Sequence, residues 1–248
     1  MPCTLSLCYA TELLATCGPC PQAKPTAYAT PIEDPAERGR MWLSRLGKMI
    51  EQHKNGDFIL ASASPRRGEL LRQVGLSFRT VPSRLSESNQ GGMEPRQHAL
   101  YWAAAKAKDV AQRYPQEWVL GADTIVVIDG DILGKPANLS EAVAMLSRLS
   151  GRSHIVITAL CLILGQSGAE GKEWVQTTVA MRDFSPADIQ GYVATGEPMD
   201  KAGAYGIQGI GGCLVQRIEG SYSNVVGLPL CETVVLLRRH GVADPFRK

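Results

Sequence analysis

The chain has 248 residues, which is long enough to bury one sizeable core, and its 26 basic and 24 acidic residues nearly balance. This near-neutral charge argues against sequence-independent binding of nucleic acid. The longest apolar run, residues 155–164, is far shorter than the roughly 18 residues that a membrane-spanning helix needs. We therefore expect no nucleic-acid or membrane partner, and because the N-terminus lacks a secretory pattern we expect a cytoplasmic protein.

The first 55 residues differ in composition from the rest of the chain. Residues 1–35 are rich in Pro, Thr, Ala and Cys and show no period, whereas apolar residues recur on one helical face within 37–52. The sequence thus predicts an N-terminal extension over 1–55, flexible apart from one helix near 37–52, and a single folded domain over 56–243. The cysteines number seven, and an odd count does not indicate a disulfide framework.

Within the folded domain, strand-like and helix-like segments alternate. Strand patterns cover residues 58–63, 77–81, 118–128, 154–164, 173–181 and 214–219, and helical patterns cover 64–74, 94–114, 140–149, 185–195 and 230–240. The pair Asp129-Gly130 is typical of a hairpin turn, with Ile132 and Leu133 beginning the return strand. Alternation combined with a hairpin predicts an α/β fold with a mixed sheet flanked by helices.

A buried strand runs directly into Ser62-Ala63-Ser64-Pro65-Arg66-Arg67. Ser64 suits a helix N-cap and Pro65 the first helical position. A helix N-terminus exposes unpaired N–H groups with partial positive charge, and hydroxyls and guanidinium groups beside it suit phosphate. The stretch indicates an anion site; the alternative is that both arginines are surface residues paired with nearby carboxylates.

The stretch Gly121-Ala122-Asp123-Thr124 places an acid inside an otherwise apolar strand. A buried carboxylate is costly unless it is paired or binds a metal. Lys135, just beyond the hairpin, would make Asp123 part of a structural ion pair. The other interpretation, which we favour, is a carboxylate that binds a metal or activates water beside phosphate.

Three further candidates are weaker when taken alone. Glu87 lies in a loop and could share a divalent ion with Asp123, and Lys106 lies on the alanine-rich helix at 94–114. In the glycine-rich stretch 200–212, the backbone could approach a ligand closely and Gln208 supplies both a donor and an acceptor. A glycine-rich turn within a β region is the alternative for that stretch.

Taken together, these motifs resemble the Maf family of nucleoside triphosphate pyrophosphatases. The resemblance rests on "SASPRR" at 62–67, "GADT" at 121–124, "GKP" at 134–136, residues 200–209 and "GSYSNVVGLPL" at 220–230. It implies a cytoplasmic, often dimeric enzyme with an elongated mixed α/β fold and a deep central cleft. It also implies hydrolysis of a nucleoside triphosphate to monophosphate and diphosphate with a divalent metal, magnesium or manganese.

The resemblance also implies roles for particular residues. Phosphate would be held by Ser62, Ser64, Arg66, Arg67, Lys106 and Lys135. Asp123 would be the proton acceptor or a metal ligand, with Glu87 in support, although the family usually has two adjacent acids where this chain has Ser86-Glu87. Arg66, Thr124 and Gln208 occupy the positions that the family associates with base selection.

The Ala-Asp-Thr pattern and the tyrosine-glutamine stretch resemble the branch of the family that acts on dTTP and UTP. Modified pyrimidine nucleotides are a second class of substrate that the residues allow. The alternative from another class is a non-catalytic nucleotide-binding regulator of septum formation or cell division.

Overall fold

The computed structural model describes residues 58–85 and 92–247. The predicted extension at 1–55, its helix near 37–52 and Glu87 lie outside these described residues. The strands are β1 (Phe58–Leu60), β2 (Phe78–Thr80), β3 (Trp118–Ile128), β4 (Asp131–Leu133), β5 (Ser153–Leu164), β6 (Ala169–Met181) and β7 (Val215–Glu219). The helices are α2 (Pro65–Gln73), α3 (Pro95–Arg113), α4 (Leu139–Leu149), α5 (Pro186–Ala194), α6 (Tyr222–Val226) and α7 (Leu230–Arg239), with three short 3-10 helices, η1 (Glu197–Asp200), η2 (Ala202–Ala204) and η3 (Ile210–Leu214).

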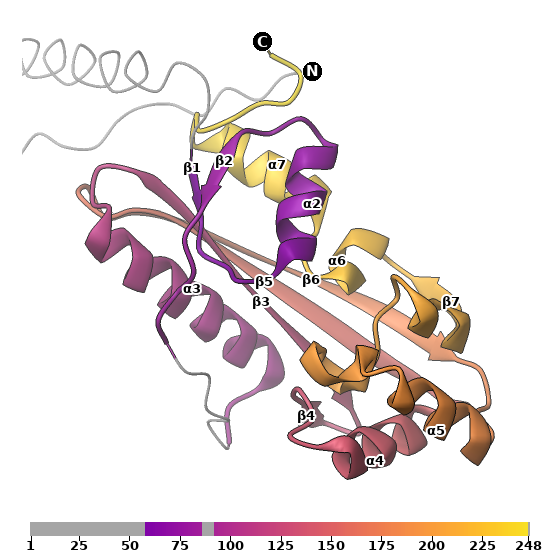
Figure 1. The fold of residues 1–248 in the computed structure, drawn as a ribbon. Helices are drawn as coiled ribbons and strands as arrows, with labels where there is room; N and C mark the ends of the chain where they lie inside the picture. Colours follow the sequence, from indigo (N-terminus) through magenta and orange to yellow (C-terminus); the bar gives the residue numbers. More distant parts are fainter. Residues whose placement is uncertain (1–57, 86–91, 248) are drawn as a thin grey trace, which may run out of the picture. The chain divides into compact units, whose positions relative to one another are not determined.

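The strands form one seven-stranded mixed sheet, as predicted (Figure 1). Its order is β2-β1-β3-β5-β6-β7, and the short β4 pairs with β3. β1 runs parallel to β2 and β3, whereas the pairs made by β4, β5, β6 and β7 are antiparallel. None of the described helices is both long and apolar enough to cross a membrane.

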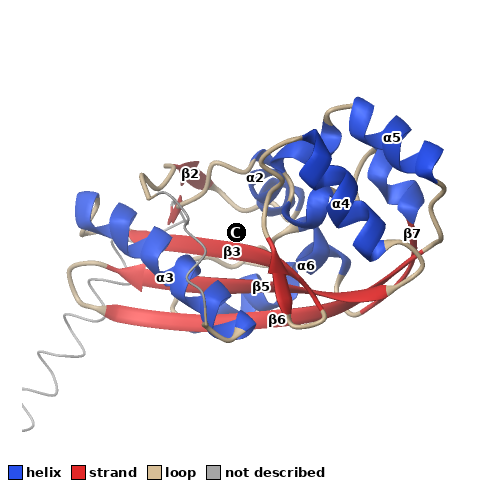
Figure 2. Ribbon diagram, turned by 90° about the horizontal axis from the view of Figure 1, so that it is seen from below, coloured by secondary structure: helices blue, strands red, loops and turns tan. Residues whose placement is uncertain are grey.

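Helices cover both faces of the sheet (Figures 1 and 2). Because side chains alternate along a strand, Val119 of β3 packs against α3 on one face and Leu120 packs with α2 and α7 on the other. A third apolar cluster joins the far end of the sheet to α4, α5 and the 3-10 helices. The helix predicted over 185–195 is present as α5, and a capping box formed by Ser185 and Asp188 begins it.

The glycine-rich stretch folds differently from the alternative considered for it. Instead of a turn within a β region, the stretch contains the 3-10 helices η1, η2 and η3, with residues 205–209 as a non-helical segment between η2 and η3. Gly203 inside η2 and Gly209 just before η3 both have positive φ angles, which glycine adopts without strain. The short helix α6 was also not predicted, because five residues carry too little periodicity to be recognised.

One edge of β3 is interrupted, and this gap determines where a site can form. β1 pairs with β3 only as far as Leu120, and β4 joins the same edge at Val126. On this edge, residues 121–125 therefore have no strand neighbour, while the opposite edge pairs with β5 along the same stretch. Side chains from both faces of the sheet can approach this notch, which we define as residues 121–125 of β3.

Gly121 sets how closely α3 can pack against the notch. A Cβ atom at this position would collide with the backbone carbonyl oxygen of Ala103 and lie 2.9 Å from the Cβ of Ala107. Both contacts are with residues of α3 that cannot easily give way. Glycine is thus required here by the close approach of helix and strand.

Replacement Gly121→Ala should lower the free energy of unfolding by about 3 kcal/mol or more, because overpacking against backbone cannot be relieved by a rotamer change. Urea denaturation measures this loss. Gly191→Ala is the matched control, since Gly191 lies on α5 with nothing within 4 Å of the added Cβ. The control should gain about 0.5–1 kcal/mol from helix propensity. Equal stability of the two variants would contradict the proposed close packing.

A buried histidine links the sheet to η2. His154 of β5 is 2% exposed, and its Nε2 lies 2.7 Å from the hydroxyl of Tyr205. Burial lowers the pKa of His154 from 6.5 to about 4, so the imidazole is neutral at pH 7. In the unfolded chain it would take up a proton near pH 6.5, and stability therefore falls as the pH drops from about 6.5 toward 4.

At pH 5 this single group should cost about 2 kcal/mol of folding free energy relative to pH 7. The comparison is with His154→Gln, which keeps a polar partner for Tyr205 but does not titrate. Urea midpoints at pH 7 and pH 5 should show a drop in the native protein about 2 kcal/mol larger than in the variant. Parallel pH dependence of the two proteins would show that His154 is not responsible.

Candidate active site

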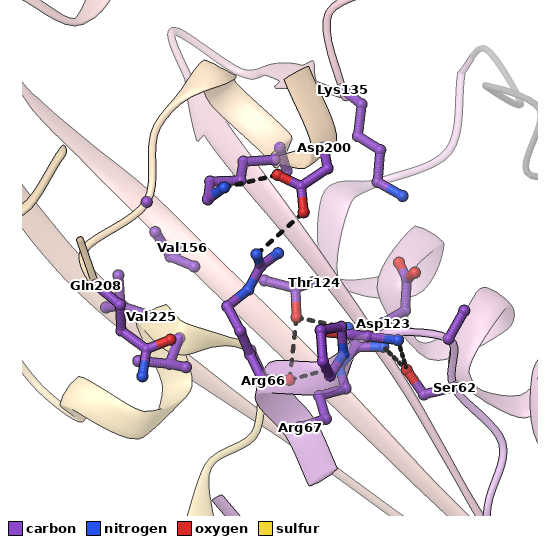
Figure 3. A pocket seen from close by; sticks show the side chains of 18 of the residues that line it. Ser62, Arg66, Arg67, Asp123, Thr124, Lys135, Val156, Asp200, Gln208 and Val225 are labelled. Atoms are coloured by element: carbon purple, nitrogen blue, oxygen red, sulfur yellow. Dashed lines mark hydrogen bonds and ion pairs between the residues drawn. The ribbon is translucent and has the colours of Figure 1, made fainter. Parts of the chain in front are cut away.

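A cavity of about 620 Å³ lies at the notch in β3. It is bordered by the start of α2, the middle of β3, the loop after β4, the 3-10 helices and the end of α6 (Figure 3). Nine of the predicted site residues line it: Ser62, Ser64, Arg66, Arg67, Lys106, Asp123, Thr124, Lys135 and Gln208. The remaining one, Glu87, is outside the described residues.

The N-terminus of α2 borders this cavity with an unusual cap. Ser64 occupies the N-cap position, but its side chain makes no capping hydrogen bond. Its backbone N–H instead donates to the hydroxyl oxygen of Ser62 at 3.1 Å. The first turn of α2 therefore has no side-chain cap at Ser64, and an uncapped helix N-terminus favours binding of an anion.

Arg67 closes part of the open edge of β3. Its guanidinium donates to the carbonyl oxygens of Ala122 at 2.9 Å and Gly227 at 2.8 Å. It also donates to the hydroxyl oxygens of Thr124 at 3.0 Å and Ser62 at 3.2 Å (Figure 3). Arg67 is only 9% exposed, so its charge is fixed at the cavity wall. Its bond to the Ala122 carbonyl replaces one that a neighbouring strand would give.

Asp123 points to the α3 face of β3 and pairs with Lys106. The Lys106 Nζ lies 2.6 Å from Oδ1 of Asp123, and both side chains are buried. From the sequence, Lys135 was considered as the ion-pair partner of Asp123. In the structure the partner is Lys106. Oδ2 of Asp123 has no hydrogen bond to any described residue, and it remains available to a ligand.

Thr124, the next residue, points to the opposite face and joins a buried polar network. Its hydroxyl lies 3.0 Å from that of Thr158, which donates to the backbone oxygen of Asn224 at 3.0 Å. The fully buried Asn224 donates to Val156 and Thr177. Thr158, Thr177 and Asn224 were missed as site residues, although the stretch "GSYSN" that contains Asn224 had been singled out.

Arg66 lies nearer to solvent and is held by an acid that the sequence analysis did not pair with it. Its Nη1 lies 3.1 Å from Oδ2 of Asp200, whose Oδ1 accepts from Lys201 Nζ at 2.6 Å. Partial burial favours the neutral carboxyl of Asp200, but Lys201 and Arg66 outweigh it and hold its pKa below the usual value. In the described structure Arg66 is thus oriented by an exposed carboxylate that an incoming anion could replace.

The cavity has two chemically different ends. In Figure 3, Lys135 and the group formed by Ser62, Arg67 and Asp123 lie away from Gln208, with Arg66 and Thr124 between them. Lys135 is exposed and has no hydrogen bond or ion pair with any described residue. The Gln208 end is lined by Val156 and Val225 and is more apolar. A long ligand with an anionic tail and a flat polar head would match this division.

The cavity can also be tested against the predicted divalent metal. The described residues contain no group of three or more His, Cys, Asp or Glu side chains placed to hold a metal ion by themselves. Magnesium commonly binds one or two carboxylates and completes its shell with water and substrate phosphates. The available Oδ2 of Asp123 fits such a metal, provided that the substrate supplies further oxygen ligands.

Comparison with known proteins agrees with these features. The family described as Maf-like protein matches residues 57–240. A dTTP/UTP pyrophosphatase of Syntrophotalea carbinolica is 49% identical over 199 residues, which are 79% of this chain and 90% of that protein. Those of Moorella thermoacetica and Symbiobacterium thermophilum are 50% and 51% identical, covering 74% of this chain and 95% and 93% of theirs. The chain therefore belongs to the Maf family.

Proposed function

We propose that the protein is a nucleoside triphosphate pyrophosphatase that hydrolyses dTTP and UTP to the monophosphate and diphosphate. The observation that carries this proposal is the single cavity in which Arg66, Arg67, Lys106 and Lys135 gather around Asp123, with the Gln208 amide at the other end. Relatives about 50% identical over most of their length bear the name dTTP/UTP pyrophosphatase.

In this proposal the triphosphate occupies the cationic end of the cavity. The uncapped start of α2, with Ser62 and Ser64, provides hydrogen-bond donors, and Arg66 and Lys135 provide mobile charges. Arg67 contributes a fixed positive charge because its hydrogen bonds hold it in place. Neutralising and aligning the phosphates is the main task in phosphoryl chemistry, since the protein forms no covalent bond to them.

The reaction itself is an in-line attack of water on the α-phosphorus. A bond forms between the water oxygen and the α-phosphorus while the bond to the bridging oxygen breaks, and diphosphate leaves. Lys106 holds Asp123 by Oδ1, which leaves Oδ2 directed to orient the water and accept its proton, or to bind the metal. When bound, the divalent ion would neutralise charge on the phosphate oxygens. In this proposal Glu87 supplies a second carboxylate that shares the divalent ion with Asp123.

Base choice is assigned to the other end of the cavity. The Gln208 amide can accept from N3–H and donate to O4 of uracil or thymine. Rotating the amide would suit cytosine equally well, so Gln208 distinguishes uracil from cytosine only when its amide keeps one orientation. Arg66 and Thr124, which lie between the two ends, are proposed to help position the base (Figure 3).

Modified pyrimidine nucleotides fit the same chemistry and differ only in groups on the ring. The non-catalytic regulator is disfavoured, because Asp123, Lys106 and Lys135 line one cavity as catalysis would require. The dimeric state and the cytoplasmic location implied by the resemblance stay predictions.

The proposal is tested by measuring diphosphate release from dTTP, UTP, CTP, ATP, GTP and a panel of 5-substituted pyrimidine triphosphates, with magnesium or manganese. We expect dTTP and UTP to give the highest kcat/KM among the common nucleotides and the reaction to stop when EDTA removes the metal. A higher kcat/KM for a modified pyrimidine would assign that nucleotide as the substrate. No turnover of dTTP or UTP would refute the proposal.

Lys135→Ala separates a role in substrate binding from a role in folding. Because Lys135 is exposed and unpaired among the described residues, its removal should change stability by less than about 0.5 kcal/mol. Loss of a charged contact to phosphate should lower kcat/KM for dTTP by about 10- to 100-fold. Lys108→Ala is the matched control, an exposed lysine of α3 that does not line the cavity. Equal activity of the two variants would remove Lys135 from the site.

A further inference from the structure

The turn that carries Gln208 is hydrogen-bonded at both ends to Tyr192 and Glu197, two residues that have no role in the reaction proposed above. At one end, the Gly206 N–H donates to the Tyr192 hydroxyl at 3.1 Å. At the other, the N–H groups of Ile210 and Gly211 each donate to Glu197, at 3.0 Å. Gln208 lies between these attachments and faces the cavity.

Glu197 and Tyr192 form a single unit that braces this turn. The Tyr192 hydroxyl donates to Oε1 of Glu197 at 2.9 Å, and Tyr192 is only 4% exposed on α5. Burial by itself would raise the pKa of Glu197, but the two amides, Tyr192 and Lys201 hold it below the usual value. Glu197 is therefore ionised at neutral pH, and both of its oxygens are engaged by the turn or by Tyr192.

The glycines of the turn leave room for this brace. Gly209 has φ +80°, and a Cβ atom there would lie 2.9 Å from Oε2 of Glu197. A Cβ atom at Gly211 would collide with the Tyr192 hydroxyl. The glycine-rich sequence thus lets a carboxylate and a phenol reach the backbone of the turn closely, and the flexibility that glycine would otherwise give is removed by hydrogen bonds.

We propose that Glu197, together with Tyr192, is a positioning residue for base selection, which fixes the backbone of the turn 206–211 and with it the place from which the Gln208 side chain meets the base. This inference rests on the proposed dTTP/UTP activity and deepens it. Glu197 acts on the base through Gln208 and not by touching the reacting phosphates. A turn held in one place lets Gln208 reach the same edge of the base in every bound nucleotide.

The test is a double-mutant cycle on the ratio of kcat/KM for UTP to that for CTP. Glu197→Gln removes the charge and one acceptor oxygen, and it should lower this ratio about tenfold through a higher KM for UTP, with kcat within about threefold. Gln208→Ala should lower the ratio as well. In the double variant, Glu197→Gln should have no further effect on the ratio. Additive effects, or an equal loss of kcat for both nucleotides, would overturn the proposal.

Two further variants keep the result interpretable. Tyr192→Phe removes only the hydroxyl and should lower the ratio in the same direction, which covers the case in which Glu197→Gln does not fold. Asp188→Asn is the matched control, because Asp188 also accepts a backbone N–H bond at the start of α5 but does not contact the turn. It should leave the ratio unchanged, and a similar loss in this control would overturn the proposal.

Equilibrium binding separates this proposal from the proposed function. Titrating the native protein with non-hydrolysable α,β-imido analogues of UTP and CTP measures base discrimination without turnover. Discrimination that is lost in Glu197→Gln would support positioning even if hydrolysis were absent. Equal binding of the two analogues by the native protein would overturn the positioning role while leaving the hydrolytic activity to be judged by diphosphate release.

Discussion

The site depends on an open stretch of strand edge that something other than a strand must satisfy. Between β1 and β4, residues 121–125 of β3 have no strand neighbour on one side. Unpaired backbone groups in a protein interior are costly, and Arg67 meets part of this cost by donating to the carbonyl of Ala122. The same guanidinium also donates to Thr124, Ser62 and the end of α6, so it joins three elements at the wall of the cavity.

The cationic side chains of the cavity differ in how they are paired with acids: one pair is buried and another is exposed to solvent. Lys106 and Asp123 form a buried pair, in which each partner offsets the desolvation of the other. Arg66 pairs with the exposed Asp200, which solvent screens, so this contact costs little to break. Lys135 has no pairing with a described residue. Lys106 and Asp123 are therefore held by each other, whereas under the proposed function Arg66 and Lys135 could turn to the phosphates of an arriving nucleotide.

Much of the fold was predictable because it follows from short-range patterns. The apolar β3 and β5, the helix α5 and the hairpin at Asp129-Gly130 were recognisable from residue types and spacing alone. Nine residues named from motifs line one cavity, yet their partners were not predicted, because pairs such as Lys106 with Asp123 or Arg66 with Asp200 depend on which elements pack together. Gly121 illustrates the limit of prediction. The sequence shows that a glycine stands here, but only the structure shows that the backbone of α3 lies too close for any larger residue. The 3-10 helices lacked any usable period.

Asp123 and Thr124 are adjacent in the chain and project to opposite sides of the sheet. The first contacts α3, whereas the second joins the Arg67 and Asn224 network. In the proposed reaction, attack on phosphorus and selection of the ring are divided between these two consecutive residues of one strand. Deleting or inserting a single residue upstream in β3 would exchange their sides and disable both tasks together. On this strand, a new side chain at position 123 or 124 would alter one of the two proposed tasks, whereas a change in strand length would alter both.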